Sequence, residues 1–175
     1  PNERFHVMPR EMPLLLINEI IQGFEASAAH ICKAGLDGVE IVASHGYLLG
    51  QFLNPNINRR SDAYGGSRAG RMQFLQEAIA ATRRGAGEDM ILGVRLSGEE
   101  KDHDGTGLGE MLEVCAALDA NPALDYLNVT AGTSAGLAGS THIVPPMAYE
   151  AAYTAPIAAA IKARVSKPVF VAGRI

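Results

Sequence analysis

His45 and Tyr47 are the residues whose types and spacing most strongly indicate chemistry. They stand two positions apart, directly after the strand-like segment 37–43. Histidine acts near neutral pH as a proton carrier or hydrogen-bond donor, and the tyrosine phenol, with a reference pKa of about 10, still holds a proton at pH 7. Because two such groups at one strand end can face the same ligand, the pair predicts a reaction site. A histidine bonded to loop backbone and a packing tyrosine also fit these positions.

Two other predicted strands end in groups that could bind an anion. Arg95 alternates with the apolar Val94 and Leu96, so its side chain is expected on the opposite face of the strand. A cation on an inward face needs an anionic partner, which is either a bound group or an internal salt bridge. Gly173 and Arg174 close the last predicted strand, where glycine lets a phosphate approach the backbone and arginine offers a two-pronged fork.

These groups depend on alternating strands and helices to position them. Apolar residues recur with helical spacing before and between four short apolar runs. The predicted strands span residues 39–43, 90–96, 124–130 and 168–172, and the predicted helices span residues 14–34, 68–84, 108–120 and 147–164. Ser67 is the expected N-cap of the second helix, and Pro145 and Pro146 are expected to open the last one. The alternation is typical of parallel βα units.

An α/β fold with about four parallel βα units fits either a doubly wound sheet or a barrel. The strand ends favour the barrel, because they carry polar residues or glycine, and a TIM (βα)8 barrel collects its catalytic groups at the C-terminal ends of several strands. A complete barrel takes about 250 residues, whereas this chain has 175, begins without Met and stops just past a strand. We therefore expect residues 1–175 to be a single segment of an incomplete barrel, from the middle of a longer protein.

The composition argues against several other functions. A net charge of −4 and a pI of about 5.7 give no sign of a basic surface for nucleic acid. No apolar stretch reaches the about 18 residues needed to span a membrane. Cys32 and Cys115 stand in helix-like segments without a nearby partner, which predicts two reduced core residues in a cytoplasmic protein. Asp102, His103 and Asp104 could suggest a metal, but no second cluster supports one, and a solvated loop is the preferred interpretation.

The run from His45 to Ser67 closely resembles the central signature of the old yellow enzyme family of FMN-dependent oxidoreductases. The matching residues are His45-Gly46-Tyr47, Gln51 to Pro55 and Asn58 to Ser67. The run is most similar to the branch that holds bacterial ene-reductases, 2,4-dienoyl-CoA reductases and amine dehydrogenases. The resemblance implies a TIM barrel, here from the third helix through the seventh strand, with FMN as cofactor and NADH or NADPH as reductant. It also implies a small-molecule substrate and is compatible with a homo-oligomer.

The resemblance also implies roles for single residues. In the family, the histidine that matches His45 donates to a carbonyl or nitro oxygen of the substrate, and the tyrosine that matches Tyr47 protonates the α-carbon. The arginine that matches Arg95 lies at N1 and C2=O of the flavin, and the residues that match Gly173 and Arg174 contribute to FMN binding. The implied activity is nicotinamide-driven reduction of an activated C=C bond.

Val42 departs from the family pattern, and this departure keeps other functions open. Many relatives have a histidine or asparagine here, and amine dehydrogenases have a tyrosine, whereas Val42 would add an apolar wall to the substrate site. Ser134 stands where the dienoyl-CoA reductases tend to have another histidine. An aliphatic wall could suit a methylated ammonium group, so oxidative N-demethylation by an FMN-dependent amine dehydrogenase is an alternative. A non-catalytic fragment, or a half-barrel that needs a partner, is a further one.

Overall fold

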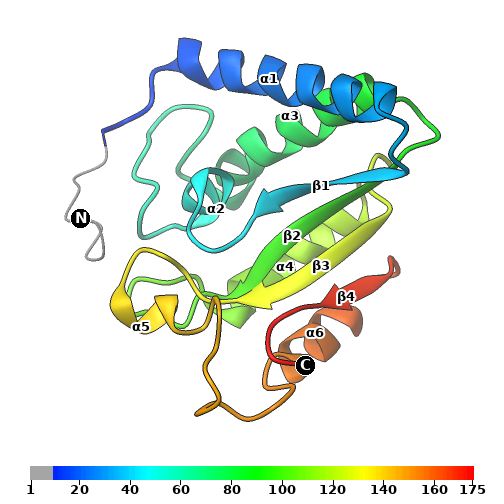
Figure 1. The fold of residues 1–175 in the computed structure, drawn as a ribbon. Coiled ribbons are helices and arrows are strands. Elements are labelled where there is room, and N and C mark those ends of the chain that lie inside the picture. The colour runs from blue at the N-terminus through cyan, green and yellow to red at the C-terminus, as the bar shows by residue number, and fades with distance from the viewer. Residues whose placement is uncertain (1–9) are drawn as a thin grey trace.

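Four short apolar segments form one parallel sheet in the computed structural model, which describes residues 10–175. The strands are β1 (Gly38–Ala43), β2 (Ile91–Glu99), β3 (Tyr126–Ala131) and β4 (Val169–Val171). They are hydrogen-bonded in chain order, and every neighbouring pair is parallel (Figure 1). The predicted α/β fold with four parallel βα units is confirmed.

Helices connect the strands and cover the sheet. They are α1 (Leu14–Lys33), α2 (Leu48–Leu53), α3 (Arg68–Ala86), α4 (Leu108–Asp119), α5 (Leu137–Ser140) and α6 (Ala155–Lys162). Helix α1 packs against α3, α4 packs against β2, and α6 packs against β4. Helix α4 lies behind the sheet in Figure 1. The sequence did not predict α2 and α5, because six and four residues are too few to show a helical period. Within residues 10–175, no helix has the length and apolar character to cross a bilayer.

The strands bury one face against the helices and turn a more polar face inward. On the buried face, Ile41, Leu92 and Val94 have at most 2% of their surface exposed and pack in one core with Phe74 of α3. The alternate residues of the strands make up the inner face, and they are Glu40, Val42, Gly93, Arg95, Ser97, Tyr126, Asn128, Thr130 and Phe170. Helices on one face of a parallel sheet fit the wall of a barrel, whereas a doubly wound sheet has helices on both faces.

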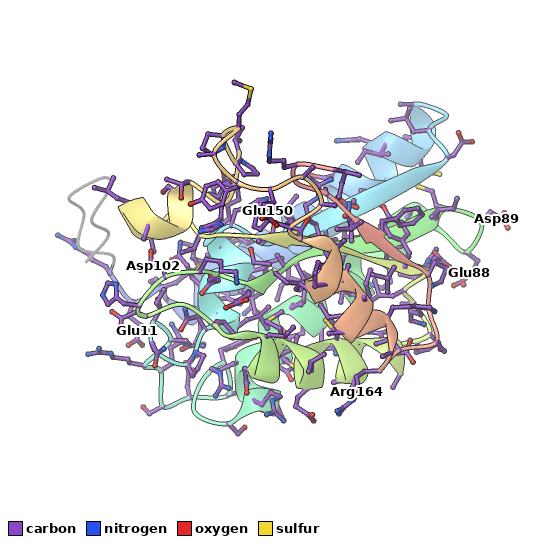
Figure 2. The ribbon with its side chains drawn as sticks, turned by 90° about the horizontal axis from the view of Figure 1, so that it is seen from below. Glu11, Glu88, Asp89, Asp102, Glu150 and Arg164 are labelled. Carbon is purple, nitrogen blue, oxygen red and sulfur yellow. The ribbon has the colours of Figure 1, made fainter. Side chains whose placement is uncertain are left out.

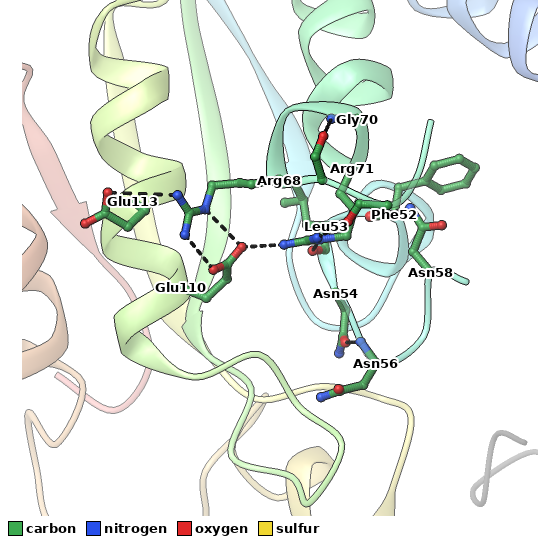
Figure 3. A network of polar contacts seen from close by, with 12 residues as sticks. Phe52, Leu53, Asn54, Asn56, Asn58, Arg68, Gly70, Arg71, Glu110 and Glu113 are labelled. Carbon is green, nitrogen blue, oxygen red and sulfur yellow. Dashed lines mark hydrogen bonds and ion pairs between the residues drawn. The ribbon is translucent and has the colours of Figure 1, made fainter. Parts of the chain in front are cut away.

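The buried Arg71 fastens the loop between α2 and α3. Its guanidinium donates to the carbonyls of Leu53 (3.1 Å) and Gly66 (2.6 Å) and to Glu110 Oε1 (2.6 Å). Arg68 binds the same carboxylate through two nitrogens, so the loop is tied to α4 (Figure 3). Arg71 therefore binds both ends of this loop, at Leu53 and Gly66.

The same loop ends at a helix cap that the sequence predicted. Ser67 Oγ accepts a hydrogen bond from Gly70 N at 3.1 Å, so Ser67 is the N-cap of α3. Such a cap satisfies one of the backbone N–H groups that have no partner in the first turn of a helix.

The last predicted helix is wrong over its first half. Residues 147–154 form turns, and only Ala155–Lys162 is helical. Contacts with other segments hold these turns, since the Tyr153 hydroxyl donates to the His142 carbonyl (3.0 Å) and the Tyr149 carbonyl accepts from Arg174 Nε (2.5 Å). Such tertiary contacts outweigh the local helical spacing.

Two further predictions need correction. Cys115 is buried as predicted, and burial raises its pKa to about 12, but Cys32 is exposed because α1 buries only a narrow stripe of its surface. The segment around Asp102 is not solvated throughout. The Asp102 side chain is only 6% exposed, and its carboxylate accepts from Gly139 N (3.3 Å) beside α5 (Figure 2).

Candidate active site

The C-terminal ends of β1, β2 and β3 meet at the backbone of His45. His45 N donates to Ser97 Oγ of β2 (2.8 Å), and the His45 carbonyl accepts from Ser134 N, which follows β3 (2.8 Å). Ser97 Oγ in turn donates to the Gly132 carbonyl (2.8 Å). Three neighbouring strands thus hold His45 in a fixed position at the edge of the sheet.

A left-handed turn leads the chain from β1 into α2. His45 has a φ of 60° and Gly46 a φ of 70°, a conformation that costs a residue with a Cβ about 1–2 kcal/mol. At Gly46 a Cβ would overlap with Thr133 Oγ1 and come within 3.2 Å of Ser134 N. The turn therefore requires glycine at this position, and it brings Tyr47 to the N-cap of α2.

The side chains of His45 and Tyr47 lie next to each other at this turn. Their ring centroids are 6.2 Å apart and their planes make an angle of 77°. Tyr47 is 52% exposed, and its hydroxyl makes no hydrogen bond with any described residue. The structure thus brings the two predicted groups together and leaves the phenol accessible to a ligand.

The surroundings of His45 shift the pKa of its imidazole. Desolvation and then the positive charge of Arg95 lower the pKa of the imidazole, and only a hydrogen bond with the Ala131 backbone acts in the opposite direction. A neutral imidazole can donate one hydrogen bond. The buried Nδ1 has no partner within residues 10–175. Because buried polar atoms are normally hydrogen-bonded, His45 fits a ligand that supplies a partner.

Arg95 lies on the inner face of the sheet beside this turn. It stands opposite Val42 of β1 and Asn128 of β3. Its Nε donates to Glu40 Oε1 at 2.7 Å, so the internal salt bridge, one of the two partners expected for Arg95, is present. Val42 is 43% exposed and gives this part of the face an apolar wall. Binding of an anionic ligand by Arg95 stays a prediction.

Glu40 is the residue of this site that the sequence alone did not single out. Besides the salt bridge, its Oε2 accepts from the Tyr126 hydroxyl (3.0 Å) and from Asn128 Nδ2 (2.8 Å). Burial and then the bond to Glu40 raise the pKa of Tyr126 to about 12. A signal was present in the sequence, because Glu40 is a charged residue two positions before Val42 and therefore faces the same side of its strand.

Gly173 and Arg174 form hydrogen bonds with the segment that precedes α6. Arg174 Nε donates to the Tyr149 carbonyl (2.5 Å) and Nη2 to the Met147 carbonyl (3.4 Å), while the Gly173 carbonyl accepts from Thr154 Oγ1 (2.9 Å). These bonds fasten the loop that precedes α6. Among the described residues no hydrogen bond or ion pair joins them to the other predicted site residues.

The polar atoms that lack partners on the inner face fit a flavin. Arg95 uses only Nε for Glu40, and its two Nη atoms have no partner among the described residues. Asn128 Oδ1 is buried without a partner, like His45 Nδ1. A flavin ring carries both donors and acceptors along its edges, which this set of atoms could satisfy. Residues 10–175 hold no group of three or more His, Cys, Asp or Glu that could bind a metal ion.

Comparison with known proteins gives a match along almost the whole chain. The model of the NADH:flavin oxidoreductase / NADH oxidase family matches residues 2–175. The multifunctional alkene reductase/demethylase OYE of Caballeronia cordobensis is 36% identical over 169 residues, which are 96% of this chain and 24% of that protein. The N,N-dimethylglycine/sarcosine dehydrogenase of Chromohalobacter salexigens is 33% identical over 156 residues, 89% of this chain and 22% of that protein.

A solved structure gives the same correspondence in three dimensions. The complex of 2-naphthoyl-CoA reductase with 2-naphthoyl-CoA superimposes with a TM-score of 0.83 and 28% identity, over 93% of this chain and 24% of that one. The chain thus spans about a quarter of the length of these relatives. Its four parallel βα units are part of a TIM barrel.

Proposed function

Because the chain belongs to the NADH:flavin oxidoreductase / NADH oxidase family, we propose that the protein is an FMN-dependent oxidoreductase that uses NADH or NADPH to reduce activated C=C bonds of small molecules. The observation that carries this proposal is the pair of His45 and Tyr47, with ring centroids 6.2 Å apart at the end of β1. When bound, FMN would supply hydride transfer from the nicotinamide to the β-carbon of the alkene.

His45 would act on the oxygen of the activating group and Tyr47 on the neighbouring α-carbon of the alkene. The lowered pKa of His45 favours the neutral imidazole. Its single N–H would leave the Ala131 backbone to donate a hydrogen bond to the carbonyl or nitro oxygen of the substrate. One such donor to a developing oxyanion is worth about 2.7–4 kcal/mol. The Tyr47 hydroxyl, which has no partner among the described residues, would give its proton to the α-carbon as a general acid.

Three other residues would hold the cofactor. Arg95 would meet the edge of the flavin at N1 and C2=O with the nitrogens that Glu40 leaves free. Gly173 and Arg174 would contribute to the FMN phosphate site. For this role the Arg174 guanidinium would have to exchange the Tyr149 and Met147 carbonyls for the phosphate.

Oxidative N-demethylation of a methylated amine is the second candidate function. Val42 favours it, because an exposed apolar side chain cannot donate a hydrogen bond to a carbonyl oxygen but can pack against the methyl groups of an amine. Three relatives carry names in keeping with this activity. They are the N,N-dimethylglycine/sarcosine dehydrogenase, the multifunctional alkene reductase/demethylase OYE, and a probable N-methylproline demethylase of Rhizobium meliloti, which is 34% identical.

The extent of the chain leaves a third candidate. We propose that residues 1–175 correspond to the third helix through the seventh strand of a barrel in a cytoplasmic protein, which acts alone or as a homo-oligomer. Strands β1 and β4 are the edges of the sheet, and open edges tend to pair with further strands. A half-barrel that becomes active only with a partner, or a non-catalytic fragment, is the alternative.

Flavin spectroscopy on the full-length protein tests these functions. We expect flavin absorbance in the purified protein, bleaching by NADH or NADPH without oxygen, and return of the colour on addition of an enone. An N-demethylase would instead be bleached directly by a methylated amine such as sarcosine. Absence of flavin absorbance, even after FMN is added, would contradict both enzyme functions. An intact mass matching 175 residues in an active sample would support the half-barrel.

A further inference from the structure

We propose that Glu40 is a positioning residue that fixes the guanidinium of Arg95 and lowers the midpoint potential of the flavin bound beside it. This inference rests on the proposed FMN-dependent function, which by itself gives Glu40 no role. It concerns the inner face of the sheet, beside the turn that carries His45 and Tyr47.

Three donors from two strands hold the Glu40 carboxylate. Arg95 Nε of β2 binds Oε1 at 2.7 Å, and the Tyr126 hydroxyl and Asn128 Nδ2 of β3 bind Oε2 at 3.0 and 2.8 Å. The Glu40 side chain is 20% exposed and that of Arg95 36%. A carboxylate with this many fixed partners has little freedom to move, which distinguishes it from a surface ion pair between two flexible side chains.

Gly93 makes this arrangement possible. It stands between Glu40 of β1 and Tyr126 of β3 in the register of the sheet. A Cβ at Gly93 would overlap with the Tyr126 ring. The missing side chain therefore lets the Tyr126 ring lie across β2, so that its hydroxyl reaches Glu40 two strands away.

The salt bridge determines where Arg95 can bind a ligand. A guanidinium is planar, so holding Nε fixes the directions of both Nη atoms. Neither Nη atom of Arg95 binds another described residue. Asn128 stands next to Arg95 in the register, and its buried Oδ1 also lacks a partner in the described part of the chain. Arg95 and Asn128 thus offer donors and an acceptor side by side, while Glu40 holds both.

Glu40 also changes the charge that a flavin at Arg95 would meet. Two-electron reduction adds negative charge to the flavin ring, and nearby protein charges tune its electronics. Arg95 favours the reduced form, and the Glu40 carboxylate partly cancels that effect. Removing the Glu40 charge should therefore raise the ratio of reduced to oxidised flavin about tenfold at a given potential, which is a shift of about +30 mV for a two-electron couple.

The test is the midpoint potential of the full-length, FMN-loaded protein and of three variants. Glu40→Gln keeps the shape and removes the charge, so its potential should rise by the amount given above. Glu40→Asp keeps the charge and shortens the reach. It should weaken FMN binding without raising the potential. Glu113→Gln is the matched control, because Glu113 lies on the outer helix α4 and pairs with Arg164. The midpoint potential of this variant should equal that of the wild type.

Each outcome decides the proposal. If FMN binds Glu40→Gln weakly, the Kd values for oxidised and reduced FMN give the same shift, since their ratio fixes the potential. An unchanged potential in Glu40→Gln, or an equal rise in Glu40→Asp or Glu113→Gln, overturns the role of Glu40 and leaves the FMN-dependent function intact. A wild-type protein that binds no FMN overturns the proposed function, and the role of Glu40 with it.

Discussion

Gly46→Ala should damage both stability and activity, because the alanine methyl meets two obstacles at once. The φ of 70° costs an alanine about 1–2 kcal/mol. The added Cβ overlaps with Oγ1 of Thr133, which is only 1% exposed, and forcing an extra carbon into such a packed site costs a further amount of about 1–3 kcal/mol. We therefore expect the free energy of unfolding to fall by about 2–5 kcal/mol.

The effect on catalysis follows from the position of the turn. The structure must relieve the overlap by moving Thr133 and Ser134, and Ser134 N holds the His45 carbonyl at 2.8 Å. A displacement of about 1 Å at a reacting group can cost about 10²-fold in rate, so reduction of an enone should slow by about that factor.

Gly35→Ala is the matched control for this prediction. Gly35 has a φ of 75°, yet a Cβ there would meet nothing within 4 Å. The residue lies between α1 and the start of β1, away from the C-terminal ends of the strands. The free energy of unfolding of this variant should fall only by the backbone strain of about 1–2 kcal/mol, and its rate should equal that of the wild type. Urea denaturation and steady-state assays on the full-length protein give both quantities. Equal stability losses in the two variants, with unchanged rates, would refute the reasoning.

The remaining predictions concern single groups of the site and of its support. Tyr47→Phe should leave FMN bound and its reduction by nicotinamide near normal, but slow reoxidation by an enone about 10²–10⁴-fold; stopped-flow measurement of the two half-reactions checks this, and wild-type reoxidation would return Tyr47 to a packing role. Arg95→Ala should weaken FMN retention and slow flavin reduction, as measured by equilibrium dialysis and stopped flow, and full retention would contradict its place at the flavin. The folded-state pKa of His45 lies below its unfolded value, so the unfolded chain takes up the proton first and stability should fall as the pH drops below about 6.5. In urea titrations between pH 5 and 8, the stability of His45→Gln should depend less steeply on pH than that of the wild type, and an identical slope would contradict this prediction. Arg71→Met should lower the free energy of unfolding by about 3–5 kcal/mol, because Glu110 and two carbonyls lose a buried partner; a loss below about 1 kcal/mol in thermal denaturation would show that water replaces the guanidinium.

Much of the fold could be predicted from the sequence, because it depends on local patterns. The four strands are short apolar runs between helical segments, and such alternation specifies parallel βα units. The first half of the helix expected over 147–164 could not be predicted. Its residues have helical spacing, but contacts of Tyr149 and Tyr153 with Arg174 and His142 hold them in turns.

The candidate site was predictable where one short segment supplies it. His45 and Tyr47 come from a single turn, so residues that are close in the sequence are also close in the structure. Glu40 was missed because its partners lie 55 to 88 positions away along the chain. Recognising it requires the register of three strands, which the sequence alone does not specify.

The signature run is informative because much of it supports the turn that carries His45 and Tyr47. Asn58 Nδ2 donates to the carbonyls of Phe52 and Tyr64, each at 2.7 Å, and closes the loop after α2. Gly65 passes so close to the Arg60 carbonyl that a Cβ would overlap with it. Any substitution that opens this loop also frees α2, whose N-cap is Tyr47. The contacts within the run therefore support the turn that holds the Tyr47 ring beside the His45 ring.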